Sequence, residues 1–261
     1  MSILSVQRTT MVRPWAVVLA SAVALVVTVA GRAAATDVTT CGQTVVPRDI
    51  GVLQVDLDCP DSTSAVFVAD RATLAFGGHT ITGGGIRCAG TCLVLGPGVI
   101  QQVVGNGNLP AISGDAVKSR VTVQDMTLTN NGFGLISNAR RTTLTNVNVS
   151  DNLQTGIWAF FNLIGEHVVA NDNGATGIRA ENRGVRMTDL TATGNGQAGL
   201  INNGKSTRLV DSTLTGNAFG PFPGDPTVLD LFSERRPHLF NTTCDHSLNP
   251  DDLPWGVCSG D

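Results

Sequence analysis

Five asparagines recur every 21 or 22 residues through the middle of this chain. A fixed period of this length is typical of a solenoid, in which each repeat stacks on its neighbours and buries no core alone. Two further columns keep the period, a mostly polar one six positions before each Asn and a glycine column three or four positions after it. The three columns are Asn131, Asn152, Asn173, Asn195 and Asn217; Asp125, Asn146, His167, Asp189 and Asp211; and Gly134, Gly156, Gly177, Gly199 and Gly220.

The segments between these columns have the pattern of short strands. Residues 144–149, for example, alternate apolar and polar side chains, which is the period of a β-strand. Asn, Asp and Gly interrupt the pattern every few residues, so each strand is only about three to five residues long. Short strands at this period predict an all-β parallel β-helix with about one turn per repeat and coils roughly 4.8 Å apart.

Both the Asn and the Gly columns fit corners of such a coil. Asn tolerates the left-handed backbone conformation, and its amide can donate to and accept from the amides stacked above and below it. Gly suits a corner where a Cβ would clash or where φ is positive. We therefore expect the Asn column, the structural ladder, to serve the scaffold and not the chemistry.

Two segments near the N-terminus carry a family resemblance. The run Cys41-Gly-Gln-Thr44 with Asp56-Leu-Asp-Cys59, and the run 74–83 (LAFGGHTITG), resemble the opening coils of right-handed parallel β-helix repeat proteins of the pectate-lyase-like superfamily. Residues 121–220 resemble their later coils. The resemblance implies a right-handed helix of roughly eight coils over residues 41–220, but no single activity, because this superfamily includes lyases, hydrolases, epimerases and non-catalytic proteins.

The N-terminal residues predict export. Residues 16–30 form an uncharged apolar run behind Arg13, and residues 33–35 are a small-residue cleavage site, so residues 1–35 are expected to be a signal peptide. Met1 and Met11 are both possible starts. An uncleaved anchor is the alternative, although the run is short for a membrane span of about 20 residues. The mature domain would be residues 36–261, secreted, periplasmic or extracellular, with regular coils over 121–220 and a proline-rich C-terminal cap over 221–261.

The charge of the mature chain limits its partners. Removal of residues 1–35 takes away Arg8, Arg13 and Arg32, which leaves 14 basic against 21 acidic residues and a net charge of −7. Such a chain is not expected to bind nucleic acid or an anionic membrane through its overall field. Any polyanion would need a local basic surface or a bridging cation.

All six cysteines follow the predicted signal peptide, where disulfides are expected. Zinc bound by Cys88, Cys92, Cys244 and His246 is the weaker alternative. Proximity in sequence suggests Cys41–Cys59 at the N-terminal cap, Cys88–Cys92, and Cys244–Cys258 in the C-terminal tail.

The polar column is the first candidate for chemistry. Asp189 and Asp211 are expected on adjacent coils, about 5 Å apart, where they could share a proton, bind Ca²⁺ or be neutralised by arginine. Arg186 and Arg208 stand three residues before these two carboxylates and supply the last option. His167, in the same column, could act as a base or an acid.

A basic column lies five or six residues before the polar column and is interrupted by Asn162. The superfamily resemblance implies one use for the two columns together. Lyases that act on acidic polysaccharides neutralise a uronate with Asp-bound Ca²⁺ and arginine while a base removes the C5 proton. On this interpretation the catalytic residues are Asp189, Asp211, His167, Arg186 and Arg208, and the substrate-binding residues are Arg120, Arg141, Arg183, Lys205 and Trp158.

Trp158 is included because an outward-facing indole could stack on a sugar ring, whereas Phe160 and Phe161 are expected to fill the core. No metal-ligand set and no cofactor is firmly implied; Ca²⁺ is the one considered. The sequence does not set the oligomeric state.

Two functions of different class remain. Polygalacturonate hydrolases carry clustered Asp pairs and a Gly-His-Gly, but here the only Asp-Asp is Asp251-Asp252 in the tail and no Gly-His-Gly occurs. The Asp-Pro-His-Glu of alginate epimerases is also absent from the sequence. A non-catalytic module that binds extracellular or cell-wall carbohydrate, a polysaccharide or cell-surface glycan, is therefore favoured over a polysaccharide lyase. The module predicts closed Arg–Asp pairs and no cleft; the enzyme predicts an open groove with at least one carboxylate free of arginine.

Overall fold

The computed structural model describes residues 35–60, 64–102, 109–218 and 229–261. The predicted signal peptide, apart from residue 35, lies outside these ranges, as does Gly220 of the glycine column. Every regular element within them is a strand, and none of these residues belongs to a helix that could cross a membrane.

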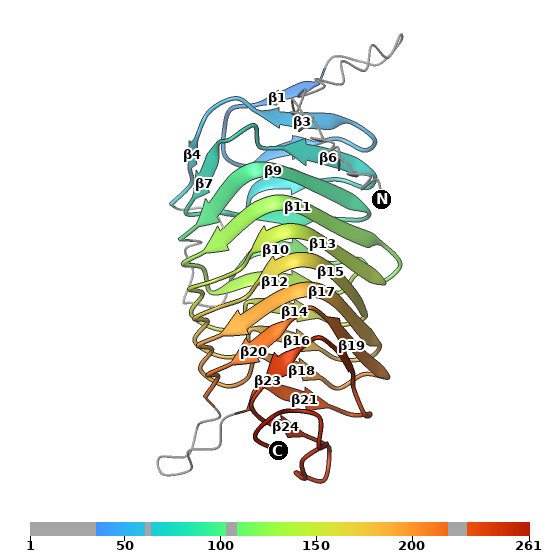
Figure 1. Cartoon of the computed structure of the whole chain (residues 1–261). Coiled ribbons are helices and arrows are strands. Elements are labelled where there is room, and N and C mark those ends of the chain that lie inside the picture. The colour runs from blue at the N-terminus through green and yellow to red at the C-terminus, as the bar shows by residue number, and fades with distance from the viewer. Residues whose placement is uncertain (1–34, 61–63, 103–108, 219–228) are drawn as a thin grey trace, which may run out of the picture. The chain divides into compact units, whose positions relative to one another are not determined.

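Two parallel sheets form the walls of a solenoid, and the chain alternates between them (Figure 1). The large sheet contains β1 (Thr36–Val38), β3 (Ile50–Leu53), β4 (Leu57–Asp58), β6 (Ala72–Ala75), β7 (Thr80–Thr82), β9 (Cys92–Gln101), β11 (Arg120–Thr129), β13 (Arg141–Asn148), β15 (Asn162–Val169), β17 (Gly184–Thr193), β19 (Ser206–Val210), β20 (Thr213–Thr215), β22 (His238–Phe240) and β23 (Thr243–Cys244). The small sheet contains β2 (Gln43–Val45), β5 (Ser64–Val68), β8 (Gly85–Cys88), β10 (Pro110–Gly114), β12 (Phe133–Ser137), β14 (Ile157–Ala159), β16 (Ile178–Ala180), β18 (Leu200–Asn202), β21 (Leu231–Ser233) and β24 (Ser247–Leu248). The predicted all-β parallel solenoid is confirmed.

The number of coils also agrees with the repeat length. Eight strands of the small sheet, β2 to β18, fall between residues 41 and 220, so seven complete turns separate the first from the last. The strands continue beyond the expected start of the cap, because β21 and β22 pair in parallel with β18 and β19. Pro237 does not prevent this pairing, since it stands immediately before β22, where a strand tolerates a missing N–H.

The core lies between the sheets and follows the alternation of each strand. On β17, Val185 and Met187 are buried, whereas Arg186 and Thr188 are exposed. Parallel pairing in register repeats this choice on neighbouring coils, so apolar side chains stack inside and polar side chains form columns outside.

The asparagine ladder forms as predicted. The backbone N–H of Asn152 and its side-chain Nδ2 both donate to Oδ1 of Asn173, at 3.2 and 3.0 Å, and Nδ2 also donates to the Leu128 carbonyl at 3.1 Å. The side-chain amides of Asn131, Asn173 and Asn195 bond to the next asparagine in the same way. All five ladder residues are buried.

One detail of the corner differs from expectation. The left-handed conformation is not found at the ladder asparagines but at the residue before each of them, such as Asp151 (φ 59°) and Asp172 (φ 53°). The preceding residue makes the turn, and the asparagine is thereby free to direct its amide into the coil.

The ladder ends on a buried carboxylate that the period did not reveal. Oδ1 of Asp230 accepts from the backbone and side-chain nitrogens of Asn217, and Oδ2 accepts from the backbone nitrogens of Asp245 and His246. Asp230 is fully buried. Four N–H donors thus satisfy the charge without a basic partner.

The glycine column is explained by close approach. A Cβ on Gly156 would lie 2.8 Å from both the Asn173 side chain and the Gly177 carbonyl oxygen, and the same contacts recur at Gly177 and Gly199. Only glycine lets the small sheet follow the ladder this closely.

All three disulfides form with the expected partners: Cys41–Cys59, Cys88–Cys92 and Cys244–Cys258. Every cysteine of the chain is therefore bonded to another cysteine, and the zinc alternative is excluded.

Replacing one ladder amide should destabilise the whole solenoid. Asn173→Ala removes the acceptor for Asn152 and a donor to the Val149 carbonyl, and it leaves buried polar groups unpaired. We expect the free energy of unfolding, measured by urea denaturation, to fall by about 2–4 kcal/mol. Asn138→Ala is the matched control, because the Asn138 side chain makes no hydrogen bond to the described residues; its effect should stay within about 0.5 kcal/mol. Equal losses for the two variants would contradict a structural ladder.

Candidate functional site

The polar column marks a bend in the large sheet. Asp125, Asn146, His167, Asp189 and Asp211 all have positive φ, between 51° and 55°. Asn, Asp and His are the non-glycine residues most often found in the left-handed region. The residue types in this column are therefore explained by the backbone before any chemistry is invoked.

Their side chains bond along the solenoid, from coil to coil. Nδ1 of His167 lies 2.6 Å from Oδ2 of Asp189, and Asn241 donates to Asp211 at 2.6 Å. Asp189 and Asp211 hold equivalent places on neighbouring coils, as predicted, yet Asp189 bonds to the coil before it and Asp211 to the coil after it. Within the described ranges neither carboxylate forms an ion pair with arginine.

The environment of His167 favours its charged form. The hydrogen bond to Asp189 is the main cause that raises the pKa of His167, and the charges of Asp189 and Glu166 act in the same direction against a smaller effect of desolvation. Oε1 of Glu166 lies 3.7 Å from Nε2. His167 is exposed, so solvent and salt weaken these interactions.

Arg186 and Arg208 belong to a different surface. Each stands three residues before the Asp of its own coil, about 10 Å away along an extended strand. Arg186 pairs in register with Arg208, and Arg208 pairs with His238, so these three side chains follow one another on successive coils. The structure thus separates the arginines from the carboxylates that the Arg-x-x-Asp spacing brought together in sequence.

Nine exposed basic residues gather where the strands of the large sheet begin. They occupy three adjacent columns: the corner before the strand, the first strand position and the third strand position. We call this surface the basic strip. It consists of Arg120, Arg140, Arg141, Arg183, Arg186, Lys205, Arg208, Arg235 and Arg236.

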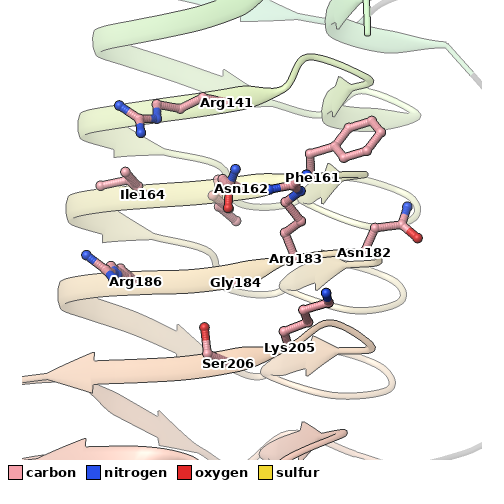
Figure 2. Close-up of a pocket in the computed structure, with 11 residues that line it drawn as sticks. Arg141, Phe161, Asn162, Ile164, Asn182, Arg183, Gly184, Arg186, Lys205 and Ser206 are labelled. Atoms are coloured by element: carbon pink, nitrogen blue, oxygen red, sulfur yellow. The ribbon is translucent and has the colours of Figure 1, made fainter. Parts of the chain in front are cut away.

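Four residues of the strip, Arg141, Arg183, Arg186 and Lys205, line a hollow of about 730 Å³ (Figure 2). Arg183 reaches from its corner toward Asn162 and Phe161 on the preceding coil, and Lys205 reaches toward the coil of Arg183. The small residues Gly184 and Ser206 leave room at the first strand position. A second hollow of about 450 Å³ shares Arg186 and Ser206 with the first. The remaining residues of the second hollow are Thr207, Arg208, Leu209, His238, Leu239 and Phe240.

Neither hollow is lined by a carboxylate. Among the described residues, none of the nine side chains of the strip takes part in an ion pair; the arginines that do are Arg71, Arg87 and Arg179. Arg87 and Arg179 lie on the small sheet, whereas Arg71 lies in the column of Arg120, two coils before it, and pairs with Asp70. The strip therefore presents cations without ion pairs to the described residues. The closed Arg–Asp pairs and missing cleft that were expected of the non-catalytic module are not found among these residues, so that expectation is wrong. Such a surface is suited to an anionic ligand.

The predicted substrate-binding residues fall in two places. Arg141, Arg183 and Lys205 line the first hollow, and Arg120 pairs in register with Arg141 one coil away. Arg183 and Lys205 lie in the corner, one residue earlier than the strand position of Arg120 and Arg141, so the basic column of the sequence is two columns in space.

Trp158 lies on the outer face of the small sheet, on β14, away from this hollow. Its Nε1 donates to Glu181 at 3.0 Å, and the Arg179 guanidinium is 5.3 Å from the ring centroid. Phe160 stacks on it with ring centroids 5.2 Å apart. These partners account for its position, and a role in sugar binding stays a prediction.

The expectation that Phe160 and Phe161 fill the core is wrong. Both are half-exposed, because they form the corner between β14 and β15 and so escape the inward alternation of the strands. Phe161 instead lines the first hollow. The sequence analysis also missed Arg140, Arg235 and Arg236, which extend the strip. Arg140 keeps the period of Phe161, Arg183 and Lys205, whereas Arg235 and Arg236 lie beyond the last regular repeat.

Among the described residues, no group of three or more His, Cys, Asp or Glu side chains is arranged so that it could hold a metal ion. Ca²⁺ at Asp189 and Asp211 stays a prediction, as does catalysis by these residues with His167, Arg186 and Arg208.

The His167–Asp189 pair gives a testable pH dependence. Because the folded pKa of His167 is raised above the usual value of about 6.5, the stabilisation from this pair is fully present below that value and is lost as pH rises through the folded pKa. Asp189→Asn should lower the pKa of His167, followed by NMR of the imidazole Cε1–H. Asp211→Asn is the control, because Asp211 bonds to Asn241 and should leave the titration unchanged. Equal shifts in both variants would contradict the pairing.

The sequence model of one family, described as right handed beta helix region, matches residues 62–219. No curated protein and no solved structure matches the chain significantly. The matched residues make up more than half of the chain and contain the repeats that form the solenoid, from β5 to β20. The chain therefore belongs to the right-handed β-helix family.

Proposed function

We propose that this protein is a non-catalytic module that binds an acidic extracellular or cell-wall polysaccharide through the basic strip. One observation carries the proposal: nine exposed basic side chains that form no ion pair with the described part of the chain lie together, although the net charge of the chain is negative. Leaving like charges side by side costs free energy in the absence of a ligand. An anionic partner that neutralises them explains why they are gathered there.

The other groups of the hollow suit a sugar polymer. Guanidinium groups form bidentate hydrogen bonds with carboxylates and sulfates. Asn162, Asn182 and Ser206 offer amide and hydroxyl groups to sugar hydroxyls, and Phe161 offers an apolar surface to the face of a pyranose ring. The open hollow lies on the outside of a sheet, where a chain of many residues can enter without threading.

An extracellular location fits the rest of the chain. Three disulfides stabilise the ends and one coil, and such bonds persist in oxidising compartments. The apolar N-terminal segment supports the same location, because it has the pattern of a secretory signal.

A polysaccharide lyase is the second candidate, and the exposed His167–Asp189 pair favours it. This pair lies about 10 Å along the strands from the strip. Both residues belong to the polar column, where the positive φ already explains the choice of His and Asp. Absorbance near 235 nm on uronate polymers, with and without Ca²⁺, tests for the unsaturated product of elimination. We expect no rise; a Ca²⁺-dependent rise that Asp189→Asn abolishes would establish the lyase instead.

Removing charge from the strip should weaken binding. We expect Arg183→Ala/Lys205→Ala to lower the affinity for polygalacturonate at least about tenfold, because two charge-assisted contacts are lost. Isothermal titration calorimetry at fixed ionic strength measures this. The matched control is Arg87→Ala/Arg179→Ala, which removes the same charge from side chains on the small sheet that already have acidic partners. Equal loss in the two variants would show that only net charge matters, and no binding by the unmodified protein would refute the proposal.

A further inference from the structure

We infer that the bound polyanion lies parallel to the solenoid axis and is contacted by successive coils from β11 to β22. This inference rests on the proposed function of the basic strip. It adds an orientation for the ligand and a minimum length, and it therefore restricts the ligand class to linear polymers that repeat an anionic group along their chain.

The register of the large sheet aligns equivalent positions of successive coils in columns parallel to the solenoid axis. The first strand positions pair in the order Arg120, Arg141 and Asn162, and the third positions pair in the order Ile164, Arg186, Arg208 and His238. Neighbouring parallel strands lie about 4.8 Å apart, so the five steps from β11 to β22 span about 24 Å.

Basic side chains are distributed over nearly all of these coils. Five of the six coils carry strip residues, and only the coil of β15 does not; that coil presents Asn162 and Phe161 to the hollow instead. By coil, the strip residues are Arg120 with β11, Arg140 and Arg141 with β13, Arg183 and Arg186 with β17, Lys205 and Arg208 with β19, and Arg235 and Arg236 with β22.

Arg235 and Arg236 precede the paired part of β22, so their place in the strip follows from their spacing to His238. Arg235 stands three residues before His238, as Lys205 stands three residues before Arg208, its register partner. Arg236 and His238 are exposed on either side of the buried Pro237. Arg236 therefore continues the outward face of the strand, and the strip reaches the last coil.

The direction across the coils is unfavourable for a polyanion. A chain laid along β15 or β17 leaves the strip within about 10 Å and meets the exposed carboxylates of Glu166 and Asp189. Along the axis, by contrast, five of the six coils within about 24 Å present basic side chains of the strip. Electrostatic repulsion by the polar column and attraction by the strip thus select the same orientation.

The test compares substitutions at the two ends of the strip with one at its centre. The variants are Arg120→Ala, Arg235→Ala/Arg236→Ala and Arg183→Ala/Arg186→Ala, with Arg87→Ala as the control on the small sheet. The ligands are polygalacturonate and a series of oligogalacturonates of increasing length, and the dissociation constant is measured over a range of salt concentrations. Matching thermal melts show that each variant is folded.

If the ligand lies along the solenoid axis, it contacts both ends of the strip, and a substitution at either end should weaken binding. For the polymer, each end variant should weaken binding about threefold to tenfold and should reduce the slope of log K against log salt by about one per charge removed. Affinity should increase with oligomer length until the chain spans about 24 Å. The shortest oligomers should be insensitive to at least one end of the strip.

Two outcomes would overturn the inference, and they differ in what else they remove. If the polymer binds and only the central variant weakens it, the ligand does not run along the axis, although the strip remains its binding surface. If the unmodified protein binds no acidic polymer, both the orientation and the proposed function fail.

Discussion

Parallel stacking of buried amides is the constraint on which the rest of this structure depends. Each ladder asparagine from Asn152 to Asn217 accepts two hydrogen bonds from the coil before it and donates to the coil after it, so a coil out of register would leave polar groups buried without partners. The ladder therefore fixes the register of the coils. It ends on Asp230, whose carboxylate is the last acceptor of the stack. The two carboxylate oxygens together accept four hydrogen bonds from N–H groups.

A fixed register turns spacing in sequence into columns on the surface. In the polar column the left-handed backbone selects Asp, Asn and His, and amide or imidazole partners on adjacent coils satisfy the carboxylates. In the basic strip no backbone requirement selects arginine, and no carboxylate within residues 35–60, 64–102, 109–218 and 229–261 forms an ion pair with it. In the sequence, the polar column and the basic residues are equally plausible as a functional site. In the structure, only the basic strip lacks a structural explanation, and we therefore assign the proposed function to it.

The repeat made most of the fold predictable. The Asn and Gly columns gave the parallel coils, their number and the outward faces, and short separations gave the three disulfide pairs. Asp230, Arg235 and Arg236 were missed because they lie beyond the last regular repeat, where spacing no longer reports position. Phe161 was misplaced because corner residues do not follow strand alternation. The Arg-x-x-Asp spacing suggested ion pairs, but an extended strand separates the two side chains by about 10 Å.

The central claim is that the arginines of the strip, and not those elsewhere, meet the polysaccharide. NMR of arginine Nε–H groups during titration with oligogalacturonate tests this directly. Arg183, Arg186 and Arg208 should shift, while Arg87 and Arg179, already paired with Asp115 and Glu181, should not. Shifts confined to Arg179, beside Trp158 on the small sheet, would place the ligand on the opposite surface and contradict the claim.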